Sequence, residues 1–153
     1  MLFLDVLTIL CTGLMIGNEL AVSLFVNPVI WRLEDRSQAR ALSLFAGILG
    51  KVMPFWYALC LLLMIGETYL RRHQPGLTLL LIAVAIWIAI IVYTVTTLVP
   101  INNRIARLGD GLPEGWRQEH KRWDTYHRWR ILSLVIAMVC LVWGILMACV
   151  ASS

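Results

Sequence analysis

The sequence predicts an all-α integral membrane protein built as a four-helix bundle, and three observations lead to this fold class. Hydrophobic residues make up 60% of the 153 residues and charged residues only 14%, whereas a soluble domain has about 45–50% apolar and about 25% charged residues. Four long apolar segments are separated by polar connections. None of these segments alternates polar and apolar residues as the strands of a membrane β-barrel do.

Each apolar segment is long enough to cross a bilayer, which takes about 20 residues. We expect helices over residues 4–30, 42–69, 77–99 and 116–150, within a single membrane domain that covers residues 1–153. The first has no early Lys or Arg and stays apolar past residue 25, so we expect a retained helix rather than a signal peptide. The fourth should be one long helix whose first half extends into the cytoplasm, because only Gly115 interrupts residues 114–130.

The connection between the third and fourth apolar segments contains several helix-breaking residues. Pro100 is expected to break or kink the third helix. Residues 102–108 should then continue as a short helix, and residues 109–113, which read Gly-Asp-Gly-Leu-Pro, should form a turn.

The positions of the basic residues predict how the chain crosses the membrane. Eleven of the 13 Lys and Arg residues lie in or beside the first and third connections, whereas the second has only Arg71 and Arg72. Basic connections stay in the cytoplasm, so both termini should face outward, and the expected location is a bacterial inner (plasma) membrane. The net charge of +4 then reflects topology and anionic lipid, so we expect the lipid bilayer as a partner and not nucleic acid.

An ionisable residue inside an apolar span is costly and needs a partner. Glu19 lies in the middle of the first span, next to Asn18. At 1.5 Å per residue it sits roughly 12 Å deeper than Asn27. Glu19 is therefore either a structural group paired across helices or a proton acceptor or substrate contact. Asn18 and Asn27 can serve as interhelical hydrogen-bonding residues or as substrate contacts.

A stripe of four residues marks the start of the fourth helix. His120, Trp123, His127 and Arg130 are spaced by 3, 4 and 3 residues, which places them on one helical face. Two histidines seven residues apart are roughly 10 Å from each other, so a metal or haem site would need another ligand such as Glu19. The four cysteines show no metal-ligand spacing. An interfacial amphipathic helix would show the same stripe.

Polar residues from three helices converge at one level of the predicted bundle. Asn27, Asn103, His127 and Arg130 should lie together at the cytoplasmic side, with Glu19 beneath them. Antiparallel four-helix bundles build their sites from such inward-facing residues. We therefore predict a polar pocket near the cytoplasmic leaflet that binds a lipophilic small molecule.

Three short motifs give the chain a family resemblance. They are Asn27-Pro28 at the end of the first helix, Pro100-Ile101-Asn102-Asn103-Arg104 after the third, and Trp123, His127 and Arg130 before the fourth apolar span. In this order and spacing the chain resembles the anthrone oxygenase-like family of small four-helix membrane proteins.

The resemblance implies an oxidoreductase that converts a lipophilic anthrone to a quinone with molecular oxygen and without a conventional cofactor. It also implies that His127 is the base that removes a proton from the substrate. Arg130 and Asn103 would then be the donors that stabilise the enolate. Glu19, Asn18, Asn27 and Trp123 would orient or bind the substrate.

The residues alone leave three alternatives to this enzyme. One is a small proton-coupled transporter that uses Glu19. Another is a haem or metal protein whose ligands would be His127, His120 and Glu19, although no cofactor is predicted. The last is a non-catalytic membrane subunit. Assembly into a homo-oligomer is also left open.

Overall fold

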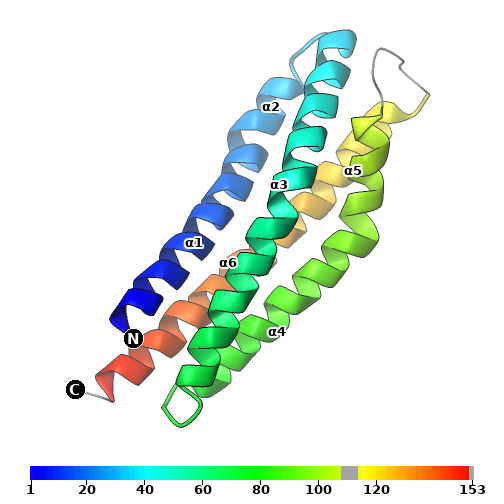
Figure 1. Cartoon of the computed structure of the whole chain (residues 1–153). Helices are drawn as coiled ribbons and strands as arrows, with labels where there is room; N and C mark the ends of the chain where they lie inside the picture. The colour runs from blue at the N-terminus through cyan, green and yellow to red at the C-terminus, as the bar shows by residue number, and fades with distance from the viewer. Residues whose placement is uncertain (108–113, 152–153) are drawn as a thin grey trace.

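Four helical rods run side by side in the computed structural model, which describes residues 1–107 and 114–151 (Figure 1). Both termini lie at one end of the bundle. All elements of the described residues are helical, and two of them are π-helical turns, labelled η. In chain order the elements are α1 (Leu2–Ala21), η1 (Val22–Val26), α2 (Asn27–Ile30), α3 (Asp35–Leu70), α4 (Leu77–Tyr93), η2 (Thr94–Leu98), α5 (Val99–Ala106) and α6 (Trp116–Val150).

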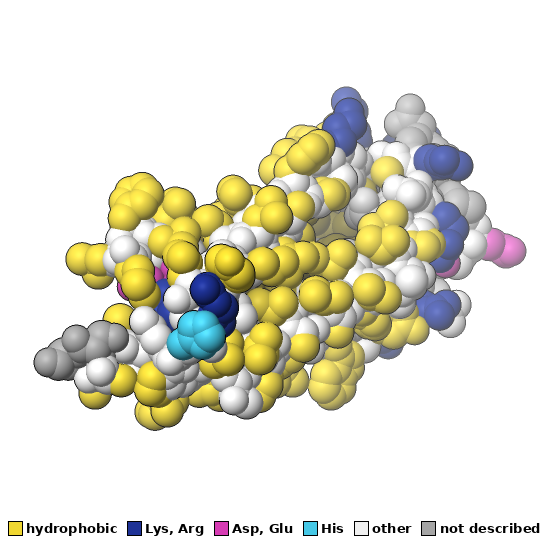
Figure 2. All heavy atoms as spheres, turned by 60° about the horizontal axis from the view of Figure 1, so that its bottom comes forward, with side chains coloured by type: hydrophobic (Ala, Val, Ile, Leu, Met, Phe, Trp, Pro, Cys, Tyr) yellow, Lys and Arg dark blue, Asp and Glu magenta, His cyan; other side chains and the backbone are white. Residues whose placement is uncertain are grey.

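The bundle has the surface of an integral membrane protein. The four rods cover Leu2–Ile30, Asp35–Leu70, Leu77–Ala106 and Trp116–Val150, and each is long and apolar enough to cross a bilayer. Hydrophobic side chains cover the middle of the molecule, and Lys and Arg side chains gather toward its ends (Figure 2). Such an apolar belt is stable in lipid, where helices satisfy all their backbone hydrogen bonds internally. The predicted fold class is therefore confirmed.

Two rods are longer than the sequence predicts. The second begins at Asp35 rather than near residue 42, because residues before the apolar span are good helix formers and Asp35 lies favourably in the first turn. The third does not break at Pro100 but continues through it to Ala106. The predicted short helix over residues 102–108 is therefore joined to the span, and its described helical part ends at Ala106. The predicted turn at residues 109–113 lies outside the described residues.

The fourth rod is a single helix, as the sequence predicts. Its 35 residues correspond to about 52 Å, which exceeds the roughly 30 Å hydrocarbon core of a bilayer. The first turns of α6 therefore extend beyond the apolar layer, together with the start of α3 and the end of α5 (Figure 1). The assignment of this end to the cytoplasm stays a prediction.

A buried ionic cluster stabilises the opposite end of the bundle. The Arg71 guanidinium contacts Asp5, with 2.6 Å between Nη2 and Oδ1, and also Glu67. The Thr8 hydroxyl donates to Glu67 at 3.3 Å. All four side chains are buried, so Arg71 is the cation that compensates two carboxyl groups away from water.

Replacing Arg71 with methionine should destabilise the protein, because it leaves Asp5 and Glu67 buried without their cation. The expected loss in the free energy of unfolding is about 3–5 kcal/mol, measured by denaturant unfolding in detergent. Arg72 is the matched control, because it is exposed and its guanidinium interacts with Tyr69 at the surface. Arg72→Met should change the stability by about 0.5 kcal/mol or less. Equal losses in both variants would show that the pairing of Arg71 with Asp5 and Glu67 does not stabilise the bundle.

Candidate functional site

A cavity of about 410 Å³ lies among the four rods, in the half of the bundle that contains η1 and η2. Most of its wall is apolar. The polar and ionisable side chains on it are those of Asn18, Glu19, Asn27, Tyr57, Thr94, Asn102, Trp123, His127 and Arg130. An apolar cavity with a few convergent polar groups is typical of a small-molecule site.

The cavity opens to the lipid-facing surface of the bundle. Phe45 and Pro54 of α3 and Val95 of η2 line the cavity and are also exposed on the outside. A recess is visible among the hydrophobic side chains of the face drawn in Figure 2. The lining of the cavity therefore extends to the apolar outer surface of the bundle.

Two π-helical turns lie at the level of the cavity. Each is followed by a helix with a proline at its start, Pro28 after η1 and Pro100 after η2. Proline lacks an N–H and its ring clashes with the carbonyl four residues earlier. The wider π turn accommodates this, since its hydrogen bonds span five residues, as from the Asn27 N–H to the Val22 carbonyl. Residues of both turns line the cavity.

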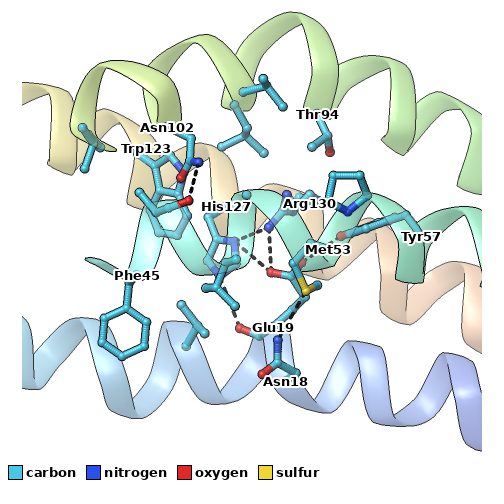
Figure 3. A pocket seen from close by; sticks show the side chains of 18 of the residues that line it. Asn18, Glu19, Phe45, Met53, Tyr57, Thr94, Asn102, Trp123, His127 and Arg130 are labelled. Carbon is cyan, nitrogen blue, oxygen red and sulfur yellow. Dashed lines mark hydrogen bonds and ion pairs between the residues drawn. The ribbon is translucent and has the colours of Figure 1, made fainter. Parts of the chain in front are cut away.

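Four buried side chains form an ionic cluster on the cavity wall (Figure 3). Arg130 Nη2 lies 2.6 Å from Glu19 Oε2, and the Tyr57 hydroxyl donates to Glu19 Oε1 at 3.0 Å. His127 Nδ1 lies 3.3 Å from Glu19 Oε2. Glu19 therefore has partners on α3 and α6, and the cluster ties three rods together inside the membrane.

The hydrogen bonds of His127 define which ring nitrogen carries the proton. Nε2 lies 3.2 Å from the Glu19 backbone carbonyl, which can only accept, so Nε2 is the donor. Nδ1 lies 2.9 Å from Arg130 Nη2, which can only donate, so Nδ1 presents its lone pair. The ring stacks on Trp123, with centroids 4.6 Å apart and planes 14° apart. This arrangement holds a neutral imidazole, with Nδ1 unprotonated, in the ionic cluster.

Comparison with known proteins identifies the family. A family model described as anthrone oxygenase matches residues 42–140, about two-thirds of the chain. The chain belongs to the anthrone oxygenase family. No curated protein and no solved structure matches it. The match includes Tyr57, Thr94, His127 and Arg130, whereas Glu19 lies before the matched residues.

In this anthrone oxygenase family member, most of the residues predicted for the site lie on the cavity. Glu19, His127 and Arg130 are in direct contact, and Trp123 lies against His127. Asn18 lines the cavity and contacts the Met53 sulfur at 3.7 Å.

Two of the predicted site residues are placed differently from the expectation. Asn27 lines the cavity but donates to Asp124 at 2.9 Å rather than contacting the ionic cluster. Asn103 is exposed and does not line the cavity, so its predicted position at the pocket is wrong. The neighbouring Asn102 lines it instead and donates to the Ala46 carbonyl at 3.1 Å. The reason is helical geometry, since adjacent residues of an α-helix point about 100° apart.

His120 belongs to a separate buried group. Its ring stacks on Trp31, with centroids 4.2 Å apart, and its Nδ1 lies 3.3 Å from Gln38 Nε2. It does not line the cavity. The three ligands predicted for a metal or haem are thus not brought together, and no group of three His, Cys, Asp or Glu among the described residues is arranged to hold a metal ion.

The sequence-based prediction missed Tyr57, Thr94 and Asp124. Asp124 lies beside Trp123 in the stripe of α6 and carries a signal, a carboxyl group three residues before His127. Tyr57 follows Pro54 by three residues in an apolar span, where a tyrosine is as typical of packing as of a site. Thr94 carries no sequence signal, because threonine is common in membrane helices.

Proposed function

We propose that this protein is a membrane oxygenase that converts a lipophilic, anthrone-like aromatic ketone to the corresponding quinone with molecular oxygen. The observation that carries the proposal is the ionic cluster of Glu19, Tyr57, His127 and Arg130 on the wall of an otherwise apolar cavity. The cavity suits a planar aromatic body, and the cluster offers both a base and a cation. Membership of the anthrone oxygenase family supports the same reaction.

The proposed reaction replaces the two hydrogens of the anthrone methylene with one oxygen. A base removes the first proton and leaves an enolate. The enolate carbon transfers electrons to oxygen and forms a C–O bond, and the resulting peroxide takes up a proton. Loss of the second methylene proton then breaks the O–O bond, so that one oxygen stays as a carbonyl and the other leaves as water. The carbon loses four electrons, and one molecule of oxygen gains them.

In this reaction His127 acts as the base through Nδ1, whose lone pair accepts from Arg130 Nη2 at 2.9 Å before the substrate reacts. Before proton transfer, Arg130 is paired with Glu19 at 2.6 Å. After it, the enolate is the natural partner of Arg130, and the His127 imidazolium is the natural partner of Glu19, 3.3 Å away. One ion pair becomes two, and no charge is left uncompensated in a low-dielectric site. Tyr57 and Trp123 hold Glu19 and the imidazole ring in place.

The proposal is tested by assaying the protein in lipid nanodiscs with 1,8-dihydroxyanthrone. Oxygen uptake and quinone absorbance are followed together, because anthrones also oxidise spontaneously and protein-free nanodiscs give that background. We expect a saturable rate above the background, with one oxygen consumed per quinone formed and no stimulation by added nicotinamide or flavin. A rate equal to that of the empty nanodiscs would overturn the proposed function.

The transporter alternative has less support from the geometry. A proton-coupled carrier requires a carboxyl group that exchanges protons with both sides of the membrane. Glu19 instead faces the bundle interior and is held by Arg130 and Tyr57. These partners suit a carboxyl group that is held in place better than one that exchanges protons with both sides of the membrane.

A further inference from the structure

The Thr94 hydroxyl is a buried group without a hydrogen-bond partner in the described part of the chain. Threonines in these helices normally donate to the carbonyl four residues earlier, as Thr12, Thr68 and Thr96 do at 2.6–2.8 Å. Thr96 lies in the same π turn as Thr94 and makes this bond. Thr94 does not, although its oxygen is shielded from solvent.

A second unpaired group lies on the same cavity. Arg130 Nε is also buried without a partner among the described residues, while Nη2 of the same side chain is engaged by Glu19 and His127. The Thr94 side chain reaches into the cavity from η2, and Arg130 reaches into it from α6 (Figure 3). Two separate rods therefore each hold an unpaired buried polar atom on a side chain that lines the same apolar cavity.

The chemistry of the two groups defines what they bind. An arginine N–H can only donate, and a hydroxyl donates or accepts. A buried donor left unsatisfied is costly, so both groups fit an acceptor atom supplied by a ligand. An oxygen with two lone pairs, as in a carbonyl or an enolate, can accept from both at once.

We propose that Thr94 Oγ1 and Arg130 Nε bind the carbonyl oxygen of a planar aromatic ketone in the cavity, as a two-donor cradle for that atom. Thr94 is then a substrate-binding residue. The inference rests on the proposed function, because the oxygen held there is the one that becomes the enolate oxygen after proton loss. Stronger hydrogen bonds to the enolate than to the ketone would stabilise the developing charge.

The test compares three variants by equilibrium binding of 1,8-dihydroxyanthraquinone, a stable product-like probe, to the full chain in nanodiscs. Thr94→Val keeps the shape and removes the hydroxyl, and it should weaken binding about fivefold to tenfold. Thr94→Ser should bind within about twofold of the original protein. Thr96→Val is the matched control in the same π turn, and it should leave binding unchanged because Thr96 is exposed.

Binding separates this inference from the proposed function. Equal affinity of the Thr94→Val variant and the original protein would overturn the inference. The Thr94 hydroxyl would then have a water molecule as its hydrogen-bond partner. Absence of probe binding to the original protein would overturn it as well. Weakened binding in Thr94→Val without any anthrone turnover by the original protein would support the cradle and contradict only the oxygenase. With turnover, Thr94→Val should also lower kcat, whereas a merely structural loss would leave the kcat of the folded fraction unchanged.

Discussion

Replacing His127 with glutamine is expected to lower kcat for anthrone oxidation by about 10²–10⁴-fold, which is the usual contribution of a general base. Glutamine can retain the hydrogen bond to the Glu19 carbonyl but has no basic nitrogen at the position of Nδ1. Proton removal from the methylene should then become fully rate-limiting. The measurement is quinone formation in nanodiscs, together with the rate ratio for anthrone carrying hydrogen or deuterium at the methylene.

Two other histidines serve as controls for this prediction. His73 is exposed beyond the end of α3, and His120 is buried but does not line the cavity. The variants His73→Gln and His120→Gln should both keep kcat within about threefold of the original protein. If His120→Gln lost as much activity as His127→Gln, the role of His127 as the specific base would be wrong.

Replacing Arg130 with methionine should have the largest effect on stability at the cavity. The change leaves Glu19 buried without a cation, which costs about 3–5 kcal/mol when one partner of a buried ion pair is removed. Removing both charges in Glu19→Gln with Arg130→Met should recover most of this loss, because an uncharged pair leaves no buried charge without a counter-ion. Denaturant unfolding in detergent gives the stability of both variants, and neither should oxidise anthrone.

Arg128 provides the control for Arg130 on the same helix. It pairs with Asp124 at 2.9 Å, but its side chain is 64% exposed. Arg128→Met should therefore change the stability by about 1 kcal/mol or less. A double variant of Glu19 and Arg130 as unstable as Arg130→Met alone would show that Arg130 stabilises the bundle by packing and not by pairing with Glu19.

The features that follow a local period could be predicted from the sequence. Apolar length predicts the four spans, and the spacing of His127 and Arg130 places them on one face of α6 because both lie in an uninterrupted helix. The cost of a charge in lipid predicts that Glu19 faces inward to a partner. These are properties of single helices, which a sequence reports directly.

The contacts between helices could not be predicted in the same way. Which cation meets Glu19 depends on how α1 packs against α6, and the sequence carries no measure of that. The π turn η2 adds to the difficulty, since its wider turn changes which residues beyond it face the cavity. Asn102 lies at the cavity and Asn103 outside it. The cluster of Asp5, Glu67 and Arg71 was missed because its members come from two rods and a connection.

Labelled oxygen shows whether this cavity carries out the oxygenation of an anthrone. The purified protein in nanodiscs is given 1,8-dihydroxyanthrone under ¹⁸O₂, and the quinone formed above the protein-free background is analysed by mass spectrometry. We expect one ¹⁸O atom in the new carbonyl group and the other in water, and at short reaction times neither product should have lost its label by exchange. Quinone formed only at the background rate, or a new carbonyl oxygen derived from water, would rule out oxygenation by this cavity.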